Sequence, residues 1–260
     1  FLKTLQSWEV FVTKGHFINF EGLNHCGKGT HANKLAEYLV RRLGHESVNS
    51  GSEPTKRILG RIIRELIERR QPPEAVLYEA RGYLREQAGY VLDHEFISKI
   101  ESILAKIEKK EKIDELERQL LFFADRCDHV VGVIGPSIDR GNYFVNDRFD
   151  LSTFGHGISS GIPFEALCHW HQLSVRRLGL VPDLLIFIDI SPEESFERLR
   201  VNKKEVLDIY EESLKSLGSI ADSYRFLLRS GDEWKIFAKE IAFIDGMRSV
   251  EEVTTEIKKV

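Results

Sequence analysis

The chain has 260 residues, of which 42% are hydrophobic and 30% charged, and its formal net charge is −4. This size and composition fit one large domain with a full hydrophobic core, and the negative charge argues against a broad nucleic-acid or membrane surface. The three cysteines are scattered without CxxC spacing, no apolar run approaches membrane-spanning length, and residues 1–16 show no secretory signal. We therefore expect a cytoplasmic protein.

The first predicted elements are a strand, a loop and a helix in immediate succession. Apolar residues over 17–20 form the strand, the loop runs from Gly22 to Lys28, and a helix follows with an apolar face over 32–39. A glycine-flanked loop in this context lets backbone N–H groups surround phosphate oxygens, while the helix dipole and the lysine add positive charge. The segment therefore predicts a nucleotide phosphate-binding loop.

Later apolar runs predict three more core strands, over 143–145, 184–190 and 241–244, and a further helical pattern spans 167–178. Strands that alternate with helices favour an α/β fold with a central parallel sheet flanked by helices. Ligands of such sheets bind at the carboxyl ends of the strands. We therefore expect the loop, Glu53-Pro54 and Asp147-Arg148 to meet at one edge of the sheet.

Residues 72–118 have a different pattern. Phe96, Ile100, Ile103 and Ile107 recur at helical spacing, and lysine and glutamate fill the positions between them. The pattern predicts an amphipathic helical hairpin. Because its charges alternate in sign, a solvated helix pair packed on the core is favoured over a nucleic-acid or membrane role.

Several conspicuous residues also have ordinary structural interpretations. The cluster over 168–171, Cys-His-Trp-His, fits no familiar zinc spacing, so helix packing is favoured over a metal site. Taken alone, Phe122 and Phe123 could be plain core, and Arg126 and Arg148 could form surface ion pairs with nearby aspartates. The candidates for such pairs are Asp125, Asp128 and Asp150.

The surrounding segments decide between these interpretations. The chain contains, in order, FINFEGLNHCGKGT, SEPT followed by GRIIR, LLFFADRCDHV, VNDRFDLSTFGHG, VPDLLIFIDISPEESFERLR and IAFIDGMRSVEEVTTEI. Together these resemble the thymidylate (dTMP) kinase family of nucleoside monophosphate kinases, over residues 15–70 and 118–260. The resemblance implies a three-layer P-loop kinase fold, with a single domain over 1–260. In this division 1–14 is an N-terminal extension, 72–118 an inserted helical hairpin and 200–210 a lid over ATP.

The resemblance implies Mg²⁺-dependent transfer of the γ-phosphoryl group of ATP to dTMP, giving dTDP. Catalysis of this kind depends on positioning and on neutralising charge. The family pattern places Lys28 on the outer phosphates of ATP and Arg148 between the acceptor phosphate and the transferring group. It gives Asp147 a catalytic role, and makes Asp147 and Glu53 candidates for holding Mg²⁺ through water.

The same resemblance implies two sets of binding residues. Those expected to bind ATP are Gly22, Asn24, His25, Cys26, Gly27, Lys28, Gly29, Thr30, Arg198 and Arg200. Those expected to bind the acceptor are Glu53, Pro54, Arg64, Phe122, Arg126, Arg148, Ser152 and Thr153. Within the second set, Arg64 should hold the acceptor phosphate, and Phe122 and Arg126 should stack on and hydrogen-bond the base. Thr153 should meet the base edge, and the Glu53–Pro54 peptide bond is expected to be cis.

The chain departs from the family pattern at four places. Gly29 stands where a Mg²⁺-binding Ser or Thr is expected, and Asn24 replaces a carboxylate. Gly155-His156-Gly157 replaces the AYQ triplet, and the lid sequence after Arg200, VNKKEVLDIYE, lacks the usual arginines. Arg198 or Arg200 is then the candidate for the missing positive charge.

These departures leave two rival functions. A kinase for another acceptor, such as dUMP or a deoxynucleoside, is motivated by the altered triplet. A catalytically weak nucleotide-binding regulatory module, acting through the helical hairpin, is motivated by Asn24, Gly29 and the arginine-poor lid. The expected partners are small-molecule nucleotides, and the resemblance suggests a homodimer.

Overall fold

The computed structural model describes residues 15–87, 92–201, 213–229 and 233–260. Its centre is a sheet of five parallel strands in the order β2-β3-β1-β4-β5. The strands are β1 (His16–Glu21), β2 (Val48–Ser52), β3 (Tyr143–Asp147), β4 (Leu184–Asp189) and β5 (Glu240–Asp245). The predicted parallel sheet is confirmed, including the four strands that apolar runs had indicated.

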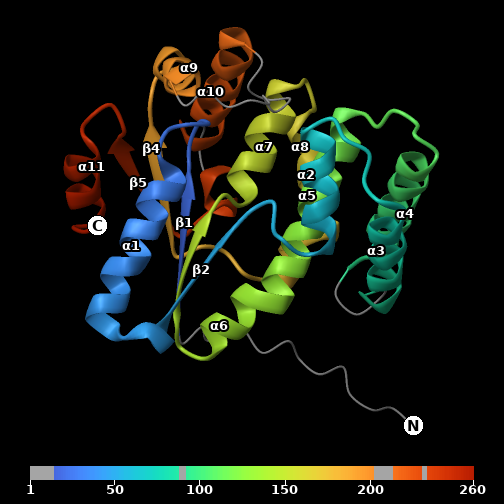
Figure 1. The fold of residues 1–260 in the computed structure, drawn as a ribbon, viewed down its shortest axis with the longest axis horizontal. Coiled ribbons are helices and arrows are strands. Elements are labelled where there is room, and N and C mark those ends of the chain that lie inside the picture. The colour runs from blue at the N-terminus through green and yellow to red at the C-terminus, as the bar shows by residue number, and fades with distance from the viewer. Residues whose placement is uncertain (1–14, 88–91, 202–212, 230–232) are drawn as a thin grey trace.

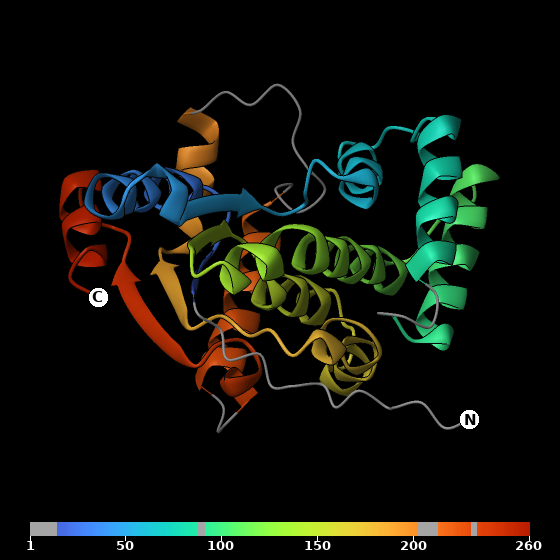
Figure 2. The same ribbon diagram turned by 90° about the horizontal axis from the view of Figure 1, so that it is seen from below.

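Helices cover both faces of this sheet (Figure 1, Figure 2). The first layer holds α1 (Lys28–Leu43) and α11 (Val250–Ile257); the other holds α5 (Glu115–His129), α7 (Asp150–Ser159) and α10 (Leu214–Arg229). Four more helices surround these layers: α2 (Ile58–Ile67), α6 (Gly135–Asp139), α8 (Phe164–Leu173) and α9 (Pro192–Val201). The alternation of side chains in β1 explains the layering, because Phe17, Asn19 and Glu21 face one layer and Ile18 and Phe20 the other.

Residues 72–118 hold two further helices, α3 (Glu74–Gln87) and α4 (His94–Glu108), before α5 begins. The apolar residues Phe96, Ile100, Ile103 and Ile107 of α4 are buried, with at most 2% exposed. Figure 2 shows this pair at one end of the molecule, with α5 between it and the sheet. The apolar residues of this helix pair therefore extend the hydrophobic core beyond α5.

The predicted helix over 167–178 is wrong in its length. Helix α8 ends at Leu173, and a separate 3₁₀ turn covers Val175–Leu178. The carbonyl of Leu173 accepts a hydrogen bond from the backbone N–H of Asp93, at 3.2 Å, and Ser174 leaves the helical conformation. A partner far away in the sequence thus ends the helix.

Two predicted segments lie outside the described residues: the N-terminal extension over 1–14 and nearly all of the lid over 200–210. Among the residues that the structure describes, no helix has the length and apolar character needed to cross a bilayer.

Candidate active site

The loop after β1 has the conformation that its glycines allow. Gly22 has φ 140° and Gly27 has φ 95°, which are values that residues with a side chain rarely adopt. A Cβ on Gly22 would also lie 2.4 Å from the carbonyl oxygen of Ile188 in β4. The loop therefore passes close to the neighbouring strand and turns directly into α1 at Lys28.

The side chain of Lys28 folds over this loop. Its ammonium donates to the carbonyl oxygens of Gly22, at 2.9 Å, and Leu23, at 2.6 Å. Burial lowers the pKa of Lys28, and the nearby Arg148 guanidinium lowers it further. The lysine is thus held at the loop, where phosphate oxygens can replace carbonyls as its partners.

Arg148 follows β3 in a turn with a left-handed backbone, φ 75°. Its Nη1 donates to Ser152 Oγ at 2.8 Å, and its Nη2 donates to Asn24 Oδ1 of the phosphate-binding loop. Burial alone would lower the pKa of Arg148, but neighbouring groups such as Tyr224, Asp147 and Glu21 hold it above its ordinary value. Arg148 therefore stays charged and directly contacts the loop.

A cavity opens on the side of the loop where Arg148 lies. Seven of the residues that line it were expected acceptor-binding or loop residues: Asn24, Glu53, Pro54, Phe122, Arg148, Ser152 and Thr153. Three others, Ile67, Gln119 and His156, had no predicted role. Gln119 and His156 lie three or four positions from predicted site residues on α5 and α7, so helical spacing is the signal that could have found them.

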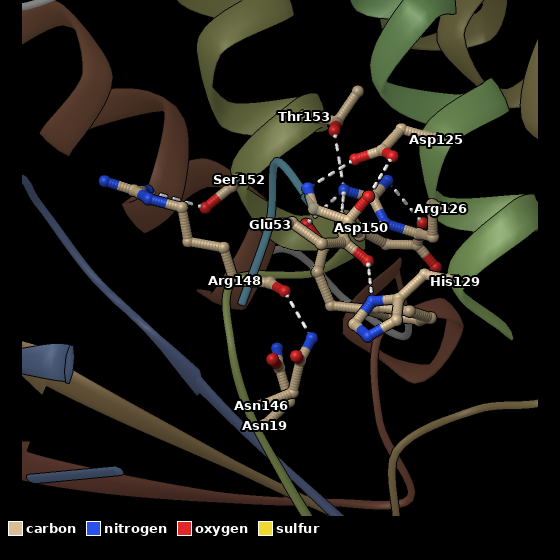
Figure 3. Close-up of polar contacts among 12 residues, drawn as sticks. Asn19, Glu53, Asp125, Arg126, His129, Asn146, Arg148, Asp150, Ser152 and Thr153 are labelled. Carbon is tan, nitrogen blue, oxygen red and sulfur yellow. Dashed lines mark hydrogen bonds and ion pairs between the residues drawn. The ribbon is translucent and has the colours of Figure 1, made fainter. Parts of the chain in front are cut away.

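Arg126 lies beneath this cavity and is 1% exposed. As Figure 3 shows, it is surrounded by its own partners: Nε donates to Glu53 at 2.8 Å, Nη1 to Asp150 at 2.9 Å, and Nη2 to Thr153 Oγ1 at 3.0 Å. Burial alone would lower the pKa of Arg126, but Glu53 and Asp150 hold it above its ordinary value. Arg126 thus fixes two residues of the cavity wall, Glu53 and Thr153. Its pair with Asp150 is buried, so the alternative of a surface ion pair is wrong for Arg126.

Two histidines extend this buried network. His129 Nδ1 lies 3.2 Å from Glu53 (Figure 3), and His171 Nε2 lies 3.1 Å from Asp150. The pKa of Asp150 is lowered, because His171 and Arg126 together outweigh the effect of burial. His171 thus packs and bonds inside the fold, and no cluster of three or more metal-binding side chains occurs among the described residues.

The turn after β2 supplies the remaining acceptor-side residues. The Glu53–Pro54 peptide bond is cis, as predicted. Arg64 of α2 donates to the carbonyl oxygens of Pro54 and, at 3.4 Å, Thr55. Arg64 therefore lies over this turn, and it is not among the residues that line the cavity.

A second cavity lies on the opposite side of the loop. Its wall includes Cys26, Gly27 and Thr30 of the predicted ATP site, and Arg198 of α9. Arg198 donates to the carbonyl oxygen of Gly246 at 2.8 Å, and its other contacts include the backbone of His25. The segment after β5 completes the wall with Gly246, Arg248, Ser249, Val250 and Val253, none of which was predicted. Arg200 does not line this cavity and pairs with Glu197 at the surface, at 3.0 Å.

Asp147 lies where a divalent cation could be held. A Cβ on Gly29 would be 3.0 Å from Asp147 Oδ2, and Asp147 Oδ1 is buried without a hydrogen-bond partner among the described residues. Mg²⁺ at nucleotide sites takes one or two carboxylates together with phosphates and water, so this oxygen fits it. Both carboxylate oxygens of Glu53 already have partners, Arg126 and His129.

The triplet Gly155-His156-Gly157 has a structural consequence on α7. A Cβ on Gly155 would lie 2.4 Å from Cε1 of Tyr224, so the glycine lets this ring pack directly against the helix. Burial lowers the pKa of His156 well below its ordinary value, and Arg148 and Lys28 add to this. A neutral imidazole therefore lines the acceptor-side cavity.

Comparisons with known proteins agree with this geometry. The thymidylate kinase family model matches residues 83–257, which is more than half of the chain. A thymidylate kinase of Prochlorococcus marinus (strain MIT 9312) is 27% identical over 248 residues, covering 95% of each chain. A thymidylate kinase of Thermoanaerobacter sp. (strain X514) is 27% identical over 94% of this chain and 96% of its own. The crystal structure of thymidylate kinase from Ehrlichia chaffeensis has the same fold, with a TM-score of 0.58 at 21% identity, and the match covers 94% of this chain and 97% of that one.

Proposed function

The chain belongs to the thymidylate kinase family and is therefore an ATP-dependent kinase of dTMP, and we propose that the phosphoryl group moves beside the loop Gly22–Lys28, from ATP in the second cavity to dTMP in the first. One observation carries this proposal. The loop forms part of the wall of both cavities, through Asn24 on one side and Cys26 and Gly27 on the other. Two nucleotides bound in these cavities would bring their phosphates together at the loop.

Arg148 is proposed to bridge the two substrates. It lines the acceptor-side cavity, and its guanidinium reaches Asn24 of the loop. The planar fork of arginine binds phosphate oxygens bidentately and stays charged, which suits a phosphoryl group that passes between two anions. Lys28 is proposed to contact the outer phosphates of ATP in place of the carbonyl oxygens that it now meets.

The acceptor base is proposed to lie against Phe122, with Thr153 at its edge, and Arg64 is proposed to hold the acceptor phosphate. Phe122 and Thr153 share the wall of one cavity, which supports their grouping. Direct contact of Arg126 with the base stays a prediction. The hydrogen bonds of Arg126 to Glu53, Asp150 and Thr153 instead support a role in which Arg126 shapes the pocket.

Asp147, rather than Glu53, is proposed to hold Mg²⁺ together with the phosphates of ATP, because Asp147 Oδ1 has no other partner among the described residues. The cation, when bound, neutralises phosphate charge as the γ-phosphoryl group moves. In Asp147→Asn, the ATP complex should bind Mn²⁺ about tenfold more weakly, measured by electron paramagnetic resonance. Equal Mn²⁺ affinity in the variant and the wild type would rule out this role.

We test the function by measuring ADP production from Mg-ATP with dTMP, dUMP, dCMP, dGMP, AMP and thymidine as separate acceptors. Selective turnover of dTMP is the expected result. Lys28→Ala and Arg148→Ala should each reduce turnover by about 10²-fold or more. Each substitution removes a positive side-chain charge that stabilises the transferring phosphoryl group. Arg225→Ala is the matched control, since Arg225 is exposed and pairs with Asp222 on α10.

A different acceptor has one observation in its favour, the neutral His156 that lines the acceptor-side cavity. Turnover of another nucleotide in preference to dTMP would establish it. ATP binding without turnover of any acceptor would instead favour the regulatory module. Near-normal activity of Lys28→Ala or Arg148→Ala would refute the roles given to these residues.

A cytoplasmic location and a homodimer are also proposed. The free cysteines Cys26, Cys127 and Cys168 support a reducing compartment. The dimer is proposed on the family resemblance alone, and size-exclusion chromatography with light scattering tests it.

A further inference from the structure

Glu21 is a buried carboxylate at the end of β1 for which no role was predicted. It is 0% exposed and directly precedes the phosphate-binding loop. Its Oε1 accepts hydrogen bonds from the backbone N–H groups of Phe149, at 2.7 Å, and Ser152, at 3.4 Å. Its Oε2 accepts from the hydroxyl of Ser152 at 2.5 Å. The carboxylate therefore holds the first turn of α7, which lies about 130 residues further along the chain.

The residue just before this helix is Arg148, whose left-handed backbone needs support. A non-glycine residue at φ 75° carries a conformational cost that the surrounding structure must offset. Its N–H donates to the carbonyl of Phe20 at 3.0 Å, and its carbonyl accepts from Asn146 Nδ2 at 2.6 Å. The next N–H, that of Phe149, is the one that Glu21 binds. Glu21 is thus one of three anchors that keep the turn in place.

Glu21 also reaches the side chain of Arg148 through one hydroxyl group. Because the Ser152 hydroxyl donates its hydrogen to Glu21, its lone pairs are left for the Nη1 of Arg148 at 2.8 Å. Burial raises the pKa of Glu21, while the Ser152 hydroxyl and Arg148 act in the opposite direction. Other charged or titratable groups that face it are Lys28 of α1 and Tyr224 of α10.

We propose that Glu21 is a positioning residue for Arg148, holding both its strained turn and its guanidinium in place for phosphoryl transfer. The inference rests on the role proposed above for Arg148. If Glu21 acted only on the fold, its hydrogen bonds to backbone N–H groups would be sufficient. The Ser152 hydroxyl also links the Glu21 carboxylate to the Arg148 guanidinium, the group proposed to contact the substrates. We call this link the Glu21–Ser152–Arg148 relay.

The test is a double-mutant cycle between Glu21→Gln and Arg148→Ala, with steady-state kinetics for dTMP and binding of a fluorescent ATP analogue. Glutamine keeps the shape and one acceptor oxygen, but its amide nitrogen cannot accept the Ser152 hydroxyl hydrogen. In the wild-type background we expect kcat to fall about 10- to 100-fold, with ATP-analogue affinity changed by less than about threefold. In the Arg148→Ala background the same substitution should change kcat by less than about twofold, because coupled residues are not additive. Glu37→Gln, an exposed residue of α1, is the matched control.

Three results would overturn the inference. An Arg148→Ala enzyme with normal turnover would overturn it together with the proposed function. An inactive Arg148→Ala enzyme beside a normal Glu21→Gln enzyme would overturn it alone. Equal losses from Glu21→Gln in both backgrounds would show a role in the fold only. If Glu21→Gln does not fold, Ser152→Ala removes the relay and leaves the Phe149 bond intact, and normal kcat in that variant would equally overturn the inference.

Discussion

Replacing Arg126 by methionine removes the central charge of the buried network while keeping a side chain of similar length. Arg126 bonds Glu53 and Asp150, whose side chains are 2% and 4% exposed. Without the guanidinium, two carboxylates stay buried with only a histidine each, His129 at 3.2 Å and His171 at 3.1 Å. The substitution therefore converts a compensated cluster into one with unbalanced negative charge.

The expected loss is large. Breaking a buried ion pair by removing one partner costs about 3–5 kcal/mol of unfolding free energy, because the remaining charge is left uncompensated.

Urea unfolding followed by tryptophan fluorescence measures this loss. Arg225→Met, which breaks an exposed pair with Asp222, should cost less than about 1 kcal/mol. The KM for dTMP should also rise in Arg126→Met, because Glu53 and Thr153 line the acceptor-side cavity. A loss below about 1 kcal/mol would refute the argument that Arg126 compensates buried charge.

Two further substitutions test packing and buried charge. Gly155→Ala should lower the unfolding free energy by about 1–2 kcal/mol, because the new Cβ would lie 2.4 Å from the ring of Tyr224. The matched change Gly218→Ala, in open space on α10, should instead raise it by about 0.5–1 kcal/mol, and thermal unfolding of the pair distinguishes these outcomes. Burial raises the pKa of Asp125 to about 6, so between its ordinary value of 3.8 and 6 the folded chain holds a proton that the unfolded chain has lost. The stability from this group is therefore lost as pH rises, and Asp125→Asn should become less destabilising, relative to the wild type, by about 2 kcal/mol from about pH 4.5 to pH 8. Identical effects of Asp125→Asn at both pH values would contradict the raised pKa.

The sequence predicted those strands whose apolar residues form an uninterrupted run, and it missed β2. Val48–Ser52 reads VNSGS and has only one apolar residue, yet it pairs in register with β3 at the edge of the sheet. Its composition reflects its neighbours, since a Cβ on Gly51 would lie 2.8 Å from the ring of His129. A strand chosen by contacts with distant residues leaves little trace in its own pattern.

The candidate site divides in the same way. Local motifs predicted the loop, and the structure brings Asn24, Phe122 and Arg148 to one cavity. Local motifs could not show that Arg126 is enclosed, because Glu53 is 73 residues away from it in the sequence. The role of Glu21 was hidden for the same reason, since its partners are 128 and 131 residues away.

Arg148, which lines the acceptor-side cavity, and Arg126, which lies beneath it, are held in place in a similar way. Glu21 ends β1 and reaches Arg148 through a hydroxyl group, whereas Glu53 follows β2 and bonds Arg126 directly. Each carboxylate stands at the carboxyl end of a parallel strand and holds an arginine that comes from another element. An arginine fixed in this way loses little side-chain entropy when a phosphate or a base arrives, and preorganised charge of this kind stabilises a transition state most effectively.

The difference between the Glu21–Arg148 and Glu53–Arg126 pairs then has a consequence for function. Arg126 has its charge balanced inside the protein, so it suits a structural role beneath the pocket. The guanidinium of Arg148 bonds the neutral groups of Ser152 and Asn24 and, among the residues that the structure describes, no carboxylate directly. Its positive charge is therefore better placed to bind phosphates, which suits a catalytic role.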